Sequence, residues 1–179
     1  MQVAGRTPGG MVCAVVDCYR VRADPLLRLL RDPERTIVAH NIRYEQSWLT
    51  FHHGFPPFRR PLDTSCGFRI LDRHWAILDA AYEPTDSRLE TVMRRVLALQ
   101  KDPFGTAWWG AEPLPDPQLR YAALDAASLL PIGETVGDLA DALGCTEQIA
   151  AASRAACEEG ARRPTPTRAA VLHGAERLL

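Results

Sequence analysis

A tyrosine and a carboxylate stand four residues apart in the stretch YAALD, at Tyr121 and Asp125. Residues spaced by four on a helix share one face, so these two side chains would lie together. A carboxylate can bind a hard divalent cation, and a phenol beside it can orient a water molecule. The same spacing also suits a surface hydrogen-bonded pair, and the residues alone leave both interpretations open.

A second acid follows a predicted strand end in the stretch IVAHNIRYEQSWL, residues 37–49, where Glu45 stands in a helix-like run. Glu45 could complement the helix dipole, or it could be a second metal ligand in the same site as Asp125. His40 and Asn41 stand where the strand meets the helix, a place that site residues often occupy in open α/β sheets. Asn41 could equally be a plain helix N-cap.

Residues 100–117 form a predicted loop, rich in Pro and Gly, that precedes the Tyr121 helix. Lys101 and Trp108 could contact a phosphate and stack on a base, as in proteins that bind single strands. The alternative is that a tryptophan packs the loop onto the core.

The elements that must position these residues alternate between strands and helices. Residues 1–10 are expected to lack regular structure and 73–86 to be irregular. Asp63 is predicted to cap a helix, and Ser87 with Glu90 to form a capping box. Strands are predicted over 11–17, which should be buried, and over 36–40. Helices are predicted over 24–32, 42–52, 87–99, 116–130, up to about 143, and 146–159. Pro131 is expected to kink or restart the helix over 116–130. This order predicts an α/β domain.

The chain has 179 residues, of which 46% are hydrophobic, and a net charge of −1. These values suit one compact domain with a real core, and any nucleic-acid binding must rest on local patches. Five cysteines without a C-x-x-C pair argue against a zinc ribbon and a disulfide framework. No run of 18 apolar residues and no signal-peptide core occur, so a cytoplasmic protein without a membrane span is expected.

Two stretches carry a family resemblance. TIVAHNIRYEQSWL resembles the second motif of the DEDD-type 3′–5′ exonucleases. The region from Ser87 to Leu130 is similar to the third motif of ribonuclease D and of the proofreading domain of family A DNA polymerases. A tyrosine four residues before the aspartate is the signature of the DEDDy subgroup. The resemblance covers about residues 11–135.

The resemblance implies a ribonuclease-H-like fold, with a mixed sheet flanked by helices, and a site in which four carboxylates hold two Mg²⁺ or Mn²⁺ ions. Asp125 corresponds to the last metal-binding aspartate and Tyr121 to the tyrosine that orients the attacking water. Glu45 stands where the family usually has aspartate. His40, Asn41, Lys101 and Trp108 are the expected substrate-binding residues. The expected partners are a single-stranded DNA or RNA 3′ end and a DNA polymerase or helicase.

The first motif of the family, Asp-x-Glu on the first strand, is not found. Asp17 is followed by Tyr19 where the glutamate would stand. The expected domain is therefore N-terminally truncated relative to the family, with a flexible segment over 1–10, an exonuclease-like domain over 11–143 and a helical extension or tail over 144–179. Two rivals follow: a catalytically inactive nucleic-acid-binding or scaffold domain beside a polymerase or helicase, and an accessory piece of a polymerase chain.

Overall fold

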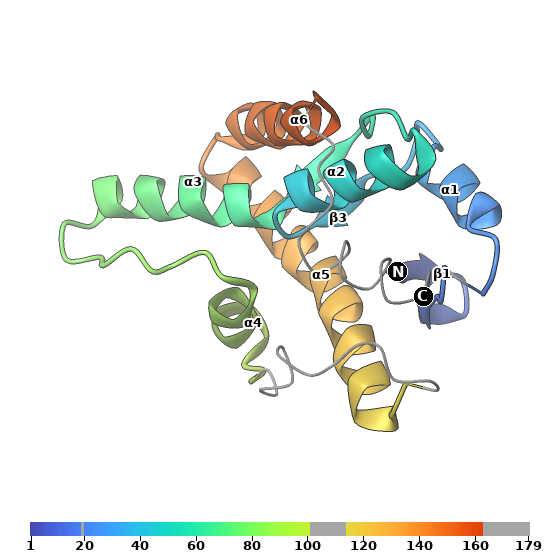
Figure 1. Cartoon of the computed structure of the whole chain (residues 1–179). Helices are drawn as coiled ribbons and strands as arrows, with labels where there is room; N and C mark the ends of the chain where they lie inside the picture. The colour runs from blue at the N-terminus through green and yellow to red at the C-terminus, as the bar shows by residue number, and fades with distance from the viewer. Residues whose placement is uncertain (19, 101–113, 163–179) are drawn as a thin grey trace, which may run out of the picture.

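The computed structural model describes residues 1–18, 20–100 and 114–162. It is a mixed α/β structure, as predicted (Figure 1). Its elements are β1 (Gln2–Thr7), β2 (Gly10–Val15), α1 (Asp24–Leu30), β3 (Ile37–Ala39), α2 (Ile42–His53), β4 (Pro61–Asp63), α3 (Thr64–Leu78), α4 (Leu89–Leu97), α5 (Asp116–Ala142) and α6 (Thr146–Arg162).

The N-terminal segment is a strand, so the prediction of an unstructured stretch over residues 1–10 is wrong. β1 pairs antiparallel with β2 from Gln2↔Val15 to Thr7↔Gly10. Pro8 and Gly9 form the two-residue loop at which the chain reverses, while Gly5 and Gly10 lie within the strands. The hydrogen bonds that order β1 come from a neighbouring strand, and composition does not report them.

The second strand of this hairpin is present but mostly exposed, so the prediction that it is buried is also wrong. Met11 and Val12 are 53% and 56% exposed. The hairpin packs on α5 through its other residues, and Cys13 Sγ contacts the Ala123 carbonyl at 3.4 Å. Valine-rich segments form strands on a sheet edge as readily as in a core.

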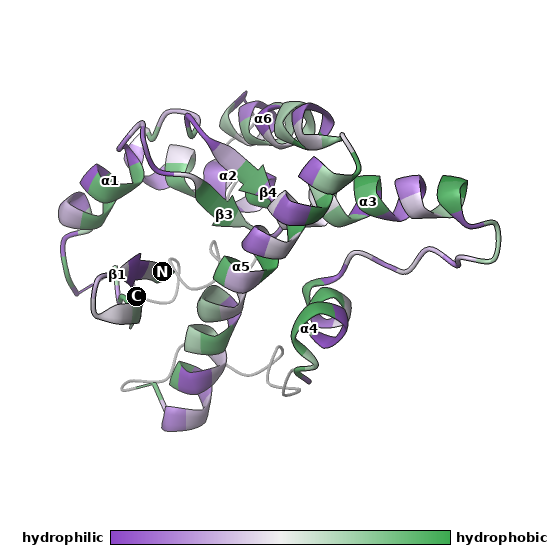
Figure 2. Cartoon of the chain, turned by 180° about the vertical axis from the view of Figure 1, so that it is seen from behind, coloured by the Kyte–Doolittle hydropathy of each residue, from purple (hydrophilic) through white to green (hydrophobic). Residues whose placement is uncertain are grey.

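The second strand pair is parallel and central. β3 pairs with β4 from Ile37↔Pro61 to Ala39↔Asp63. Seen from behind, both strands are coloured as hydrophobic and lie among the helices (Figure 2). Each strand leads directly into a helix, β3 into α2 and β4 into α3. The two helices therefore begin at the same edge of the sheet, as parallel strands require.

Helix α5 is the longest element and runs through the middle of the molecule (Figure 1). It packs against both strands of the hairpin, β3, α3 and α4. Pro131 lies inside it without ending it, so the predicted separate helices over 116–130 and up to about 143 are one element. Ile132 and Val136 are fully buried in one core cluster together with Leu71 and Met93.

Helix α6 packs closely on α2 and completes a second core cluster. Cys157 on α6 lies in it with Ile42, Leu49 and Phe55. A Cβ atom added at Gly160 would overlap the carbonyl oxygen of Arg43, so the two helix backbones are nearly in contact. Only glycine fits this crossing.

Two local predictions fail near α3 and α4. Helix α3 continues to Leu78, into the stretch expected to be irregular. Helix α4 buries Val92 and Met93 as predicted, but its N-cap is Arg88 and it has no side-chain cap. The Ser87 hydroxyl lies 3.2 Å from the Ser65 hydroxyl instead, so the capping box does not form.

All five cysteines are described, and none forms a disulfide. Within the described ranges, no helix combines the length and hydrophobicity needed to cross a bilayer.

Candidate active site

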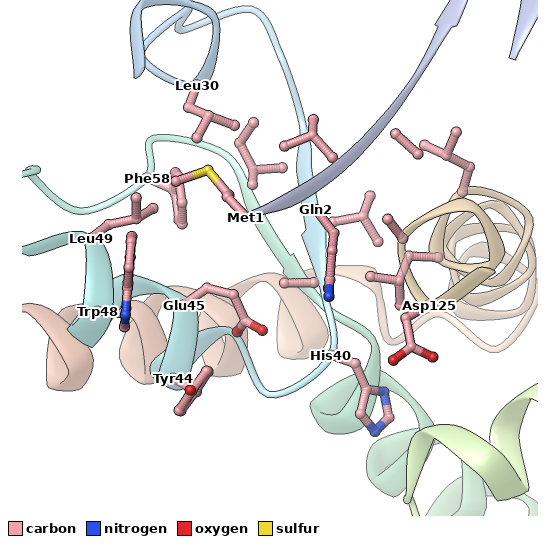
Figure 3. A pocket seen from close by; sticks show the side chains of 18 of the residues that line it. Met1, Gln2, Leu30, His40, Tyr44, Glu45, Trp48, Leu49, Phe58 and Asp125 are labelled. Carbon is pink, nitrogen blue, oxygen red and sulfur yellow. The ribbon is translucent and has the colours of Figure 1, made fainter. Parts of the chain in front are cut away.

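A pocket of about 530 Å³ lies between the two strand pairs and brings Glu45 and Asp125 together (Figure 3). Its walls come from β1, β3, α2 and α5. Residues far apart in the sequence therefore line one pocket. The lining consists of Met1, Gln2, Val3, Ala4, Leu30, Thr36, Ile37, Val38, Ala39, His40, Tyr44, Glu45, Trp48, Leu49, Phe58, Leu89, Asp125, Ala126, Leu129 and Leu130.

Glu45 projects into this pocket from the first turns of α2 (Figure 3). Its Oε2 atom is buried and has no hydrogen-bond partner among the described residues. Burial raises the pKa of this carboxyl to about 8; a backbone hydrogen bond opposes the shift, and the negative charge of Asp63 adds to it. A buried oxygen without a donor is costly unless something positive or protic meets it.

Asp125 enters the same pocket from α5, and its side chain is partly buried. In Figure 3 the imidazole of His40 is drawn nearer to the Asp125 carboxylate than to the Glu45 carboxylate in the view. Glu45 and Asp125 thus line one pocket, and their membership of one metal site stays a prediction.

His40 follows β3 and is held by Thr64, the first residue of α3. Its Nδ1 atom lies 2.9 Å from the Thr64 hydroxyl, and that hydroxyl donates to the Ala39 carbonyl at 3.2 Å. Because the hydroxyl has one hydrogen, its oxygen then accepts from Nδ1–H. The ring is therefore fixed with its proton on Nδ1 and its Nε2 edge turned away from Thr64.

Asn41 occupies the N-cap position of α2, but its side chain makes no capping bond, which corrects the prediction of a plain cap. Its backbone is left-handed, with φ of 67°. The cap is supplied by Asp63, whose Oδ1 and Oδ2 accept from the backbone N–H groups of Asn41 and Ile42 at 3.0 and 3.1 Å.

The predicted cap at Asp63 on α3 is confirmed as well. Asp63 Oδ1 accepts from the backbone N–H groups of Ser65 and Cys66 at 2.9 and 3.3 Å. One carboxylate, only 2% exposed, thus caps two helices. It fixes the start of α2, and with it the position of Glu45.

The remaining predicted residues are placed as follows. Tyr121 lies one helical turn before Asp125 on α5, is partly buried, and does not line the pocket. Lys101 and Trp108 lie outside the described residues.

Sequence reasoning missed two aromatic residues of the pocket, Tyr44 and Trp48 on α2. They are four positions apart and flank Glu45, which is the spacing of one helix face. That spacing was a signal for a shared wall beside the acid. No residue spacing in the sequence indicated that Met1 and Gln2 line the pocket, because their position depends on the packing of the hairpin against α5.

The donor set fits a hard divalent cation. Mg²⁺ is commonly bound by oxygen atoms, from one or two carboxylates together with waters and phosphates. Both acids offer such oxygen atoms. Glu45 Oε2, which has no hydrogen-bond partner among the described residues, is an atom that a cation would satisfy. Within the described residues, no group of three His, Cys, Asp or Glu side chains stands at metal-binding distances. Among the described residues, Glu45 and Asp125 are the two acids that line the pocket.

The chain is similar to known proteins over most of its length. A family model described as 3′–5′ exonuclease matches residues 4–138, which is most of the chain. DNA polymerase I of Aquifex aeolicus (strain VF5) is 29% identical over 133 residues, covering 72% of this chain and 20% of that protein. The chain thus spans about a fifth of the length of this curated relative.

A solved structure of a protein from Bifidobacterium adolescentis has a similar fold, with a TM-score of 0.64 at 19% identity; the likeness covers 89% of this chain and 40% of that one. This likeness concerns the fold alone. The family match extends over the segments that hold Glu45, Tyr121 and Asp125, and it confirms the resemblance found in the sequence. With its ribonuclease-H-like α/β fold, the chain belongs to the 3′–5′ exonuclease family.

Proposed function

We propose that this chain is a DEDDy-type exonuclease domain that hydrolyses phosphodiester bonds at the 3′ ends of single-stranded DNA or RNA, with Mg²⁺ or Mn²⁺. One observation carries the proposal. Glu45 and Asp125, which stand at the family's ligand positions, come from different helices and line one pocket. Glu45 also presents a buried oxygen without a partner among the described residues.

The proposed roles follow from placement. Glu45 and Asp125 hold the divalent ion, which when bound supplies charge for the developing phosphate oxyanion and activates water. Tyr121, one turn from Asp125, orients the attacking water through its phenol. His40, kept in one tautomer by Thr64, offers its Nε2 edge to the substrate. Asn41, exposed at the start of α2, and Lys101 contact the nucleic-acid strand.

Weak activity is the expected result for this chain. Only two acids are matched to the family's four, and misplacement of the reacting groups by about 1 Å can cost on the order of 10²-fold in rate. Because the chain is similar to part of a DNA polymerase, we also propose a DNA polymerase or a helicase as its protein partner.

A digestion assay tests the proposal. The full chain is incubated with Mn²⁺ or Mg²⁺ and a 3′-labelled single strand, beside Asp125→Asn. Slow release of labelled mononucleotide that disappears in Asp125→Asn is expected. Digestion that persists in the variant would mean a different site or a contaminant. Rapid digestion that requires Asp125 would show that other acids, such as Asp17 or Asp63, supply the missing ligands.

A second function is supported by a separate observation. Since no cluster of three metal-binding side chains occurs among the described residues, a catalytically inactive domain that binds single strands or serves as a scaffold is the rival. It predicts strand binding that is insensitive to Mg²⁺ and to Asp125→Asn. The same labelled strand, followed by fluorescence anisotropy with EDTA or Mg²⁺, separates the two functions.

We also propose that the protein is cytoplasmic, and that it consists of an exonuclease-like domain over 11–143 and a helical extension or tail over 144–179. Five free thiols support a reducing compartment for the chain.

A further inference from the structure

Three aromatic side chains lie close together on the C-terminal half of α2. The ring centroids of Trp48 and His52 are 4.4 Å apart, and those of Phe51 and His52 are 4.9 Å apart. Phe51 is 49% exposed and belongs to neither core cluster. His52 is exposed as well, so the packing of the fold does not account for either ring. Together with Trp48 they make a continuous aromatic surface on this helix.

The aromatic surface is continuous with the pocket through Trp48. This residue lines the pocket together with Glu45 and stands beside it on α2 (Figure 3). An α-helix rises about 1.5 Å per residue, so Trp48 and His52 lie about 5 and 10 Å beyond Glu45 along the helix axis. Neighbouring nucleotides of a stacked strand are about 3.4 Å apart. A strand that leaves the pocket along α2 would therefore bring roughly its second to fourth bases from the 3′ end to the aromatic surface.

A positive charge lies next to this end of α2. The guanidinium carbon of Arg31 is 5.3 Å from the centre of the Phe55 ring, and Phe55 follows the C-cap of α2 directly. Arg31 in turn follows α1, whose Leu27 shares a core cluster with Phe55, and Trp48 packs against that cluster. Figure 1 shows α1 beside the C-terminal end of α2. The core therefore holds the Arg31 cation close to the aromatic surface.

The arginines here are not used by carboxylates of the fold. Arg28 precedes Arg31 by three residues, which is close to one helical turn. Both are exposed, and neither forms an ion pair within the ranges that the structure describes. The acids on either side of them in the sequence are paired with other arginines, Asp24 with Arg22 at 2.9 Å and Asp32 with Arg35 at 3.0 Å. An arginine without a carboxylate can bind a phosphate through two of its N–H groups.

We propose that the aromatic surface and Arg31 bind the nucleic-acid strand upstream of its 3′ end, with bases stacked on the rings and a phosphate on the guanidinium. The proposal rests on the proposed function for the placement of the 3′ end in the pocket. Aromatic side chains beside positive charge are the means by which proteins bind single strands without sequence preference. His52 suits this role because burial, and then the neighbouring His53, hold its pKa below the ordinary value of 6.5, which leaves the ring neutral at pH 7.

The surroundings of the rings favour a nucleic-acid strand over a protein partner. Exposed rings alone would suit either occupant. The neighbouring Arg28 and Arg31, which no described carboxylate pairs, favour a polyanion. Continuity with the pocket through Trp48 favours the same strand whose 3′ end the pocket would hold.

Two labelled strands test the proposal on the full chain. Both are octanucleotides with fluorescein at the 5′ end. One is oligodeoxythymidylate, and the other keeps the same phosphates but carries bases only on the last two nucleotides at its 3′ end. Binding is followed by anisotropy in EDTA, which removes divalent ions and prevents digestion. The unchanged chain should bind the complete strand at least about fivefold more tightly than the strand without upstream bases.

Variants of the chain separate stacking from charge. Phe51→Ala and His52→Ala should each weaken binding of the complete strand at least about fivefold and leave binding of the strand without upstream bases unchanged. Phe51→Leu keeps an apolar side chain without the ring and should behave like Phe51→Ala. Arg31→Ala should weaken binding of both strands and lower the salt dependence of binding by about one phosphate contact. Arg73→Ala, at an exposed position on α3, is the control for charge and should change neither quantity. Melting temperatures of all variants show that they are folded.

Three results would overturn the proposal. The first is equal affinity of the unchanged chain for the two strands, because no upstream base would then be stacked. The second is an affinity for the complete strand that Phe51→Ala and His52→Ala leave unchanged, or that Arg73→Ala lowers as much as Arg31→Ala. The third is absence of binding of the complete strand at about 1 mM chain.

The digestion assay is a separate measurement, so the two proposals can fail independently. If the expected losses of binding are seen in EDTA but Mn²⁺ gives no digestion, the nuclease function is wrong and the strand-binding surface stands. If Mn²⁺ gives digestion that requires Asp125 while Phe51→Ala and His52→Ala bind like the unchanged chain, the nuclease function stands and the surface is wrong.

Discussion

Asp63 Oδ2 accepts a hydrogen bond of 3.1 Å from the backbone N–H of Ile42, the first residue of α2. The same carboxylate caps α3, which begins at the next residue. Because β3 and β4 are parallel neighbours, the two helices start side by side, and one buried acid can serve both. The position of Glu45 therefore depends on a residue outside the pocket lining.

Replacing Asp63 should destabilise the fold strongly. Asp63→Ala leaves several backbone N–H groups at two helix starts without acceptors, and a cost of about 3 kcal/mol in the free energy of unfolding is expected. Asp138→Ala, at an exposed position on α5, should change it by less than about 0.5 kcal/mol. Urea denaturation followed by circular dichroism measures both. Equal effects of the two variants would contradict the double cap.

Stability should depend on pH through Glu45. Its pKa is about 8 in the folded chain and has an ordinary value of 4.5, so the unfolded state loses its proton first as pH rises. The contribution of Glu45 to the free energy of unfolding is therefore fully present below pH 4.5. As pH rises toward 8, the free energy of unfolding should fall by up to about 4 kcal/mol. Glu45→Gln, which does not ionise, should flatten this part of the profile. Urea melts in EDTA between these two pH values test it, and identical profiles for both proteins would contradict it.

Divalent cations should stabilise the chain through the two pocket acids. Mn²⁺ should raise the melting temperature of the unchanged chain, and Glu45→Gln or Asp125→Asn should each lower the affinity for Mn²⁺ at least about tenfold. Glu34→Gln, an exposed acid outside the pocket, is the control. Calorimetric titration measures the affinity. If Glu34→Gln lowered the affinity for Mn²⁺ as much as the pocket variants do, the ion would bind outside the pocket.

Trp108 is expected to anchor the segment that leads into the Tyr121 helix. Trp108→Ala should then lower the melting temperature and leave binding of a labelled single strand little changed. The opposite result, weaker strand binding at an unchanged melting temperature, would make the tryptophan a recognition residue.

Two glycines should respond in opposite ways to alanine. Gly160→Ala forces a methyl group against the Arg43 carbonyl and should cost about 1–3 kcal/mol, the range for overpacking. Gly137→Ala, inside α5, places its methyl in open space and should stabilise by about 0.5–1 kcal/mol. Thermal melts of the two variants compare them. A stabilising Gly160→Ala would show that α6 can move away from α2.

The sequence predicted well what depends on local pattern. The spacing of Val92 and Met93 located a buried helix face, and the family motifs at Glu45 and Asp125 pointed to two residues that do share a pocket. Features that depend on partners distant in sequence were missed. Ser87 was predicted as a cap but meets Ser65, and Asn41 was predicted to cap α2, a role that falls to Asp63. The strand at Gln2–Thr7 was missed because its order comes from β2.

The contact between Gly160 and Arg43 has a practical consequence for anyone shortening this chain. The family match ends at residue 138, inside α5, and α6 lies wholly beyond it. A protein trimmed at that boundary would lose Cys157 and Ser153. The Ser153 hydroxyl donates to the Ile149 carbonyl at 2.8 Å and accepts from the Asp63 backbone N–H at 2.9 Å. It would also uncover Gln46 and Ile42 on α2. The smallest piece that keeps Glu45 in place therefore extends through α6, well past the segment by which the family is recognised.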